Sequence, residues 1–187
     1  DDTVYGSDYF DPGTPFAMAI WDSGGVDTID LSTFTEGCDL SLVSGTSSTV
    51  VCQTGGAGWS TGQMLNNLSI ASGVIIENII TGSGDDTIVG NDADNLIDGG
   101  AGADILTGGE GADIFEYNHL SGADRITDFV IGEDTLRFLD TNGDVITSAG
   151  DFDVSGIQDL AISYLGGELI LEGLNAENWG DAFLEIV

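Results

Sequence analysis

Apolar and acidic residues recur with a period of nine between residues 81 and 116. Read in nines, this segment is TGSGDDTIV, GNDADNLID, GGAGADILT and GGEGADIFE. The eighth place of each unit is apolar, and the sixth place is Asp or Asn. The small, Gly-rich first six places favour a turn, whereas the last three can be extended. The pattern therefore predicts a turn and a short strand, repeated so that the chain coils and its strands stack side by side.

The predicted coil places the sixth-place and eighth-place side chains in different surroundings. Two units make one circuit, so the eighth-place side chains stack inside as a core, and they are Ile88, Ile97, Leu106 and Phe115. The sixth-place side chains stack in rows along the edges, and they are Asp86, Asn95, Asp104 and Asp113. Nine residues after Phe115 the apolar place is taken by Asp124, so the sequence predicts that the coil ends near residue 116.

The flanking residues 1–80 and 117–187 alternate like strands, with Gly-rich turns between them. No linker or charge block separates the three zones, so we expect a single domain over residues 1–187. The predicted fold class is all-β, with a parallel β-roll in residues 81–116. Antiparallel, β-sandwich-like strands are expected to flank the roll on both sides.

The strongly acidic composition adds a requirement for positive charge. Asp and Glu number 33 against two basic residues, Arg125 and Arg137, which gives a formal net charge of −31. This charge excludes nucleic acid and an anionic membrane surface as partners, and no apolar run is long enough to span a bilayer. Carboxylates stacked about 5 Å apart repel by roughly 1 to 3 kcal/mol each at effective dielectrics between those of water and a protein surface. A cation between successive turns would replace this repulsion by attraction.

Calcium suits such turns better than magnesium does. Ca²⁺ takes six to eight oxygen ligands, and tight Gly turns supply backbone carbonyls beside the carboxylates. Mg²⁺ demands a tighter octahedral geometry and retains its waters. The sequence therefore predicts calcium as the bound ion.

The repeat and its surroundings resemble a known family. The nine-residue units resemble the calcium-binding repeats of RTX proteins. The segments "DTVYG", "IWDSGGVDTIDLSTF", "NLSIASGVIIENIITGSGDDTIVGNDADNLIDGGAGADIL" and "DRITDFVIGEDTL" closely resemble the C-terminal domain of serralysin-type secreted metalloproteases. The likeness covers most of residues 1–138 and is weak after that. A Gly- and Asp-rich flexible linker is the alternative, but linkers lack a periodic apolar residue.

The resemblance implies about six bound Ca²⁺ ions, several of them in the roll. In this family most roll ligands are backbone carbonyls, and the sixth-place side chain also binds. The first implied site uses Gly82, Gly84, Asp86, Gly99, Ala101 and Asp104. The second uses Asn91, Ala93, Asn95, Gly108, Glu110 and Asp113. Sites facing onward would use Gly100, Gly102 and Asp104, and Gly109, Gly111 and Asp113, with Asp124 as a partner from beyond the repeats.

The segment "WDSGGVDTID" forms a second candidate metal-binding constellation. Its acidic residues flank a Gly–Gly turn, so carbonyls and carboxylates can converge as they do in the roll. By resemblance, one ion is bound by Asp22, Gly24 and Asp27 with carbonyls near Asp1 and Thr3. Another is bound by Gly25, Asp27, the Ile75 carbonyl and Glu77. An acidic hairpin turn without an ion is the alternative interpretation.

Enzyme chemistry is not predicted for this chain. Its single His, His119, cannot form an HExxH zinc motif or a Ser–His–Asp set, and it has no second His or nearby Cys for a metal site. The resemblance implies secretion to the extracellular space by a type I apparatus, and folding when calcium is met outside. It also implies a missing upstream domain, because the chain begins in strand-like sequence at Asp1. That domain would be a zinc metalloprotease or, as the alternative, part of an adhesive surface protein.

Cys38 and Cys52 lie in two strand-like runs around a Ser–Gly turn. An extracellular location favours a disulfide between them, and two buried thiols are the alternative. Their spacing excludes a CxxC redox or zinc pair.

Overall fold

The computed structural model describes residues 1–6, 8–9, 17–50, 66–118, 121–139, 153–155, 160–164 and 167–172. These residues form strands and turns without a helix, as the sequence predicted. They therefore include no helix that could cross a membrane. The strands are β1 (Val4–Tyr5), β2 (Met18–Ile20), β3 (Thr28–Asp30), β4 (Asp39–Ser41), β5 (Ser47–Ser48), β6 (Leu68–Ile70), β7 (Asn78–Ile80), β8 (Thr87–Val89), β9 (Leu96–Asp98), β10 (Ile105–Thr107), β11 (Ile114–Tyr117), β12 (Ala123–Ile126), β13 (Thr135–Phe138), β14 (Asp153–Ser155), β15 (Leu160–Tyr164) and β16 (Gly167–Leu171).

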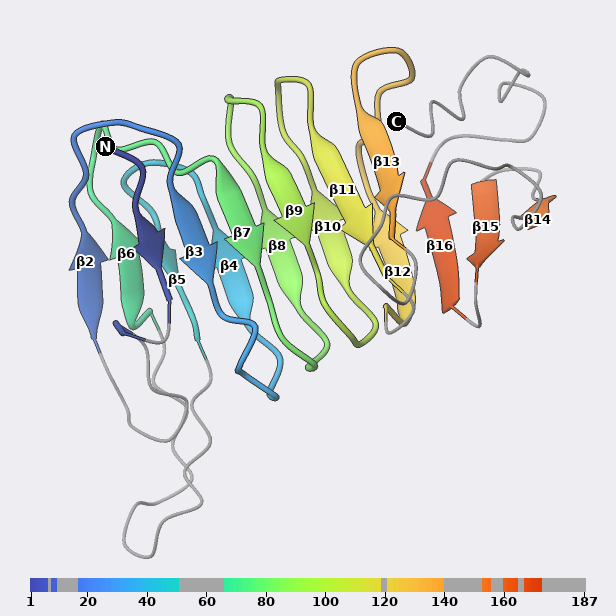
Figure 1. Cartoon of the computed structure of the whole chain (residues 1–187), viewed down its shortest axis with the longest axis horizontal. Coiled ribbons are helices and arrows are strands. Elements are labelled where there is room, and N and C mark those ends of the chain that lie inside the picture. The colour runs from blue at the N-terminus through green and yellow to red at the C-terminus, as the bar shows by residue number, and fades with distance from the viewer. Residues whose placement is uncertain are drawn as a thin grey trace, which may run out of the picture.

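Two sheets of mostly parallel strands form the body. One sheet has the order β1-β3-β7-β9-β11-β13, and the other has β14-β15-β16-β12-β10-β8-β4. Successive strands from β7 to β13 alternate between the two sheets, so the chain coils (Figure 1). Ile88 pairs with Leu106 and Ile97 with Phe115, 18 residues further on. One circuit is therefore two nine-residue units, and the predicted β-roll is confirmed.

The eighth-place side chains form the core between the sheets. Ile88, Ile97, Leu106 and Phe115 are each 0% exposed. Strands outside the repeats continue the same stack through Ile29, Leu40, Ile79 and Ile126. Each strand buries its middle residue because successive side chains point to opposite faces, and here only one face meets the opposite sheet.

The predicted end of the coil near residue 116 is wrong. β12 pairs with β10 in parallel, with Leu106 opposite Ile126, and β13 pairs with β11 in parallel, with Phe115 opposite Leu136. The spacings are 20 and 21 residues instead of 18. The turns before β12 and β13 are longer than those of the repeats. The nine-residue period therefore no longer applies there, although the chain continues to coil. Asp124 consequently occupies a sixth-place position in the coil.

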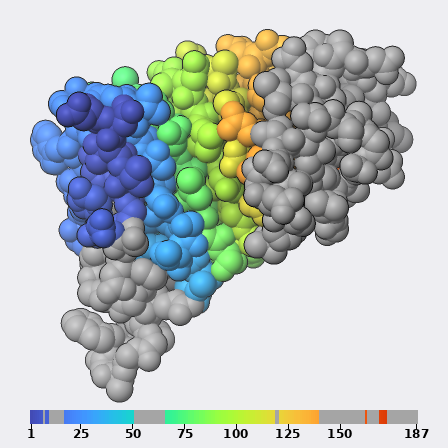
Figure 2. Space-filling model, in the orientation of Figure 1, coloured from blue at the N-terminus to red at the C-terminus, as the bar shows by residue number. Residues whose placement is uncertain are grey.

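The coil also begins earlier than the repeats do. β1, β3 and β7 pair in parallel, and β4 pairs in parallel with β8. Long connecting segments separate these strands in the sequence, but the strands still align in the register of the roll. Antiparallel pairing among the described strands is confined to β5–β6, β14–β15 and β15–β16. In Figure 2 the blue surface of the N-terminal segment adjoins the green and yellow surface of the repeats. The roll is thus longer than predicted at both ends.

Candidate metal centre

The turns that lead into the strands of the two sheets stack along two edges of the roll (Figure 1). The first edge contains the turns that lead into β4, β8, β10 and β12, which are residues 31–38, 81–86, 99–104 and 121–122. The second edge contains the turns that lead into β3, β7, β9, β11 and β13, which are residues 21–27, 71–77, 90–95, 108–113 and 127–134. The sixth-place side chains of the repeats lie in these turns, where they are buried.

Each sixth-place carboxylate along the roll uses one oxygen to tie neighbouring circuits together. On the first edge, Oδ1 of Asp86, Asp104 and Asp124 accepts the backbone N–H of Cys38, Asp86 and Asp104, at 2.6, 2.8 and 3.0 Å. On the second edge, Oδ1 of Asp113 accepts the N–H of Asn95 at 2.8 Å. The carboxylates therefore form ladders, in which each one reaches back to the preceding circuit.

The second oxygen of four such carboxylates has no partner. Oδ2 of Asp27, Asp86, Asp104 and Asp113 is buried and makes no hydrogen bond within the structure. A buried carboxylate oxygen without a donor or a cation is costly, and native proteins rarely leave one in that condition. Burial is also the largest cause that raises the pKa of Asp104 to about 8 and that of Asp113 to about 6. These oxygens fit a cation as the missing partner.

Glycines allow the carbonyls of one circuit to approach the next. A Cβ atom on Gly100 would lie 2.0 Å from the carbonyl oxygen of Gly82, and one on Gly102 would lie 2.2 Å from that of Gly84. A Cβ on Gly99 would lie 2.5 Å from Oδ2 of Asp104. Any side chain at these places would fill the space between the turns. The fold thus places Gly82 and Gly84 of the predicted first roll site next to the turn that contains Gly99, Ala101 and Asp104.

The second roll set shows the same close approach on the second edge. A Cβ on Gly108 would lie 2.2 Å from Oδ2 of Asp113, and one on Gly109 would lie 2.2 Å from the Asn91 carbonyl oxygen. Gly111 faces the backbone of Ala93 in the same way, at 2.9 Å. Glu110, whose carbonyl belongs to the predicted set, is exposed in this turn.

The N-terminal constellation is also assembled by hydrogen bonds. Oδ1 of Asp27 accepts the N–H of Thr3 at 2.8 Å, and the Asp27 N–H donates to Oε2 of Glu77 at 2.8 Å. The amino terminus of Asp1 donates to the Gly24 carbonyl at 2.9 Å, and a Cβ on Gly25 would lie 2.7 Å from the Asp1 carbonyl. The predicted residues around Asp27 are therefore neighbours.

Asp22 is held at the margin of this constellation. Its Oδ2 accepts the hydroxyl of Tyr5 at 2.6 Å, and its Oδ1 accepts the N–H of Ser23 and Gly24. The Tyr5 hydrogen bond is the main reason that the pKa of Asp22 lies below its usual value. The predicted Ile75 shares the neighbouring turn with Glu77, and its side chain is exposed.

Sequence reasoning missed two carboxylates of the last circuit. Asp134 accepts the Asp113 N–H at 3.0 Å, in the position of a sixth-place residue. Asp128 caps a turn, because its two oxygens accept the N–H groups of Gly108 and Gly109, both at 2.9 Å. Neither lies on the nine-residue count. Continued alternation in "DRITDF" and "DTLRF" was the available signal for a further circuit.

Among the described residues, no three His, Cys, Asp or Glu side chains converge as a metal cluster would require, which suits sites made mainly of carbonyls. His119 and Cys52 lie outside the described residues, so the predicted disulfide with Cys38 stays a prediction. Asn67, in a formal glycosylation sequon, is buried, and its amide donates to the Val50 carbonyl at 2.9 Å.

Comparison with known proteins agrees with the geometry. The family described as Peptidase M10 serralysin C terminal matches residues 1–168. Serralysin G of Dickeya chrysanthemi is 46% identical over 97 residues, which are 47% of this chain and 18% of that protein. A serralysin of Photorhabdus sp. (strain Az29) is 40% identical over 98 residues, 48% of this chain and 18% of that protein. The matched segment thus spans less than a fifth of these relatives, and the chain belongs to the Peptidase M10 serralysin C-terminal family.

Proposed function

We propose that this chain is a calcium-binding module that folds on reaching calcium outside the cell and stabilises a domain attached to it. The observation that carries the proposal is the set of buried carboxylate oxygens without partners, on Asp27, Asp86, Asp104 and Asp113. Ca²⁺ would supply each with a positive partner and would neutralise part of the −31 net charge. The stacked turns contribute the remaining oxygens as backbone carbonyls.

The residues that would hold the ions are those of the sequence-derived sets that lie together at the two edges. On the first edge these are Gly82, Gly84, Asp86, Gly99, Ala101 and Asp104, with Gly100, Gly102 and Asp124 toward the next circuit. On the second edge they are Asn91, Ala93, Asn95, Gly108, Glu110 and Asp113, with Gly109 and Gly111 facing onward. Around Asp27 they are Thr3, Asp22, Gly24, Gly25, Ile75 and Glu77. About six ions would follow if each set is filled.

Folding would be coupled to the ions, because each repeat buries only one large apolar side chain. Such a core does little to offset the chain entropy lost on folding, so binding free energy becomes folding free energy. In a calcium-poor cytosol the acidic chain would remain unfolded and fit for export through a type I apparatus. Outside, millimolar calcium would complete the roll.

The attached domain that fits best is a zinc metalloprotease. The relatives that match are named serralysins and metalloproteases, and the chain corresponds to a small part of each. This chain would contribute no catalysis, because its single His cannot build an HExxH zinc site.

Circular dichroism and calcium titration test the proposal. In excess EGTA the β spectrum of the purified chain should be lost, and added Ca²⁺ should restore it together with a cooperative melting transition. The pure chain should not hydrolyse casein. A β spectrum and melting temperature that are the same with and without Ca²⁺ would contradict the coupling of metal to folding.

A further inference from the structure

The turn at residues 90–95 differs from the other turns of the repeat. Its sixth place holds Asn95 instead of Asp, and Asn95 is as buried as the others, at 2% exposed. Its Oδ1 accepts the N–H of Asn91 at 2.8 Å, and its Nδ2 donates to the Glu77 carbonyl at 3.0 Å. Unlike Asp86, Asp104 and Asp113, it is left with no unpartnered oxygen.

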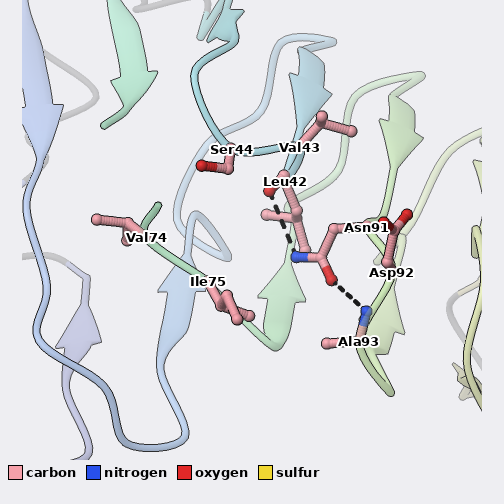
Figure 3. Close-up of a pocket in the computed structure, with 8 residues that line it drawn as sticks. All are labelled: Leu42, Val43, Ser44, Val74, Ile75, Asn91, Asp92 and Ala93. Carbon is pink, nitrogen blue, oxygen red and sulfur yellow. Dashed lines mark hydrogen bonds between the residues drawn. The ribbon is translucent and has the colours of Figure 1, made fainter. Parts of the chain in front are cut away.

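A second amide completes the same junction. Nδ2 of Asn91 donates to the Ile76 carbonyl at 2.8 Å and to the Leu42 carbonyl at 3.3 Å. Its Oδ1 accepts the N–H of Ala93 at 2.8 Å, which fixes the side chain across the turn (Figure 3). Asn91 thus ties the 90–95 turn to the turn before β7 and to the segment that follows β4.

Amides can do at this junction what carboxylates cannot. An ionised carboxylate has only acceptor oxygens, so it cannot donate to a carbonyl of the preceding turn, and a shared cation can join the two. An Asn side chain has an NH₂ group that donates directly to that carbonyl. The carbonyls of Leu42, Ile76 and Glu77 therefore receive amide protons where the turns stack.

The surroundings of the junction are apolar. Beside Asn91 lies a pocket of about 250 Å³, between the segment after β4, the turn before β7 and the 90–95 turn. Figure 3 shows the residues that line it, which are Leu42, Val43, Ser44, Val74, Ile75, Asn91, Asp92 and Ala93. Most of the side chains in this lining are aliphatic, and side-chain oxygens come only from Ser44, Asn91 and Asp92.

We propose that Asn91 and Asn95 form a metal-free rung, in which two side-chain amides replace a cation between the 71–77 and 90–95 turns. The inference rests on the proposed calcium function. The rung uses the side chains of Asn91 and Asn95 on the side that faces the 71–77 turn, and it leaves their backbone carbonyls for the second roll site on the side that faces the 108–113 turn. It thus divides the second edge, so that ions near Asp27 and ions near Asp113 bind independently. The first edge has no such interruption, because Asp86 and Asp104 in successive circuits both carry an unpartnered oxygen.

Asn95→Asp tests the rung by removing the donor and adding an acceptor that faces the Glu77 carbonyl. The variant should need a cation where the wild type needs none. Its folding equilibrium constant should gain about one extra factor of ten for each tenfold rise in free Ca²⁺. Thermal and urea unfolding over a series of calcium buffers measures this slope. Ser72→Asp adds the same charge at an exposed position of the facing turn and should keep the wild-type slope.

Asn91→Ala gives an independent reading, because it keeps the backbone carbonyl and removes only the amide. It should lower the folding constant by the same factor at every calcium concentration. A deficit that changes with calcium would mean that the Asn91 side chain helps to bind the ion, and it would overturn the proposal. So would a wild-type slope in Asn95→Asp. A wild-type protein insensitive to EGTA would instead defeat the proposed function itself.

Discussion

Replacing Asp104 by Asn should change stability in opposite directions with and without calcium. Asp104 is 1% exposed, its Oδ1 accepts the Asp86 N–H at 2.8 Å, and its Oδ2 has no partner. An Asn side chain can keep the first hydrogen bond through its own oxygen. What the substitution removes is the negative charge and the second oxygen, which are the two features that a cation requires.

The expected magnitudes follow from the burial of this carboxylate. With calcium bound, loss of one member of a buried charge pair costs about 3 to 5 kcal/mol. For a chain of this size, that corresponds to a fall in melting temperature of roughly 6 to 20 °C. Without calcium, the wild type keeps a buried oxygen without a donor, which costs about 1 to 3 kcal/mol. Asn carries no negative charge at this buried position, so the substitution should raise the stability of the metal-free fold by up to this amount.

Urea unfolding across calcium buffers, from the lowest free Ca²⁺ at which both proteins still fold to millimolar Ca²⁺, provides the assay. The midpoint curve of Asp104→Asn should cross that of the wild type, lying above it at the lowest calcium and below it at the highest. Asp85→Asn is the matched control, because Asp85 is exposed and its Oδ1 accepts the Ala103 N–H at 2.9 Å. It should stay within about 0.5 kcal/mol of the wild type throughout. Curves that do not cross would refute the assignment of Asp104 to cation binding.

Three further outcomes follow from the same geometry. In EGTA, circular dichroism should show more β structure near pH 5 than near pH 8. Burial raises the pKa values of Asp104 and Asp113 to about 8 and about 6, so their neutral forms favour the fold, and this stability is lost as pH rises through those values. Gly100→Ala should destabilise the calcium-bound protein by more than about 3 kcal/mol in urea unfolding, because its Cβ would lie 2.0 Å from the Gly82 carbonyl oxygen. Gly45 also has a positive φ but lies in open space, so Gly45→Ala should cost only about 1 kcal/mol. Magnesium in place of calcium should restore little of the β spectrum at equal concentration, and equal recovery with both ions would contradict an oxygen cage sized for calcium.

The circuits of the roll were predictable from sequence only where turn length is constant. Between residues 81 and 115 each turn has six residues, so the nine-residue period of apolar residues directly indicates which side chains face the core. β12 and β13 follow longer turns, and their buried Ile126 and Phe138 fall off the count. β1, β3 and β4 pair across still longer excursions, which no local period can reveal. Register there is set by burial of one face of each strand instead of by spacing.

The candidate site was predictable to a similar extent. Residue types at fixed places identified the carboxylates of the repeats, but not the two functions of each one. The structure shows that one oxygen of Asp86 or Asp104 accepts an N–H of the preceding circuit while the other stays unpartnered. Sequence also treated Asn95 as equivalent to Asp, because both supply a side-chain oxygen. The difference appears only with the Glu77 carbonyl in position to receive the amide.

The acidic chain relieves its charge repulsion differently along the coil. In the middle circuits, buried carboxylates leave oxygens for cations, and at the 90–95 turn amides replace them. On the strands of the last circuits, the two basic residues of the sequence pair with acids on neighbouring strands, Arg137 with Glu116 at 3.1 Å and Arg125 with Glu172. These ion pairs are partly exposed and therefore contribute little on their own. They need no metal, so their contribution to the register of these strands should not change with calcium.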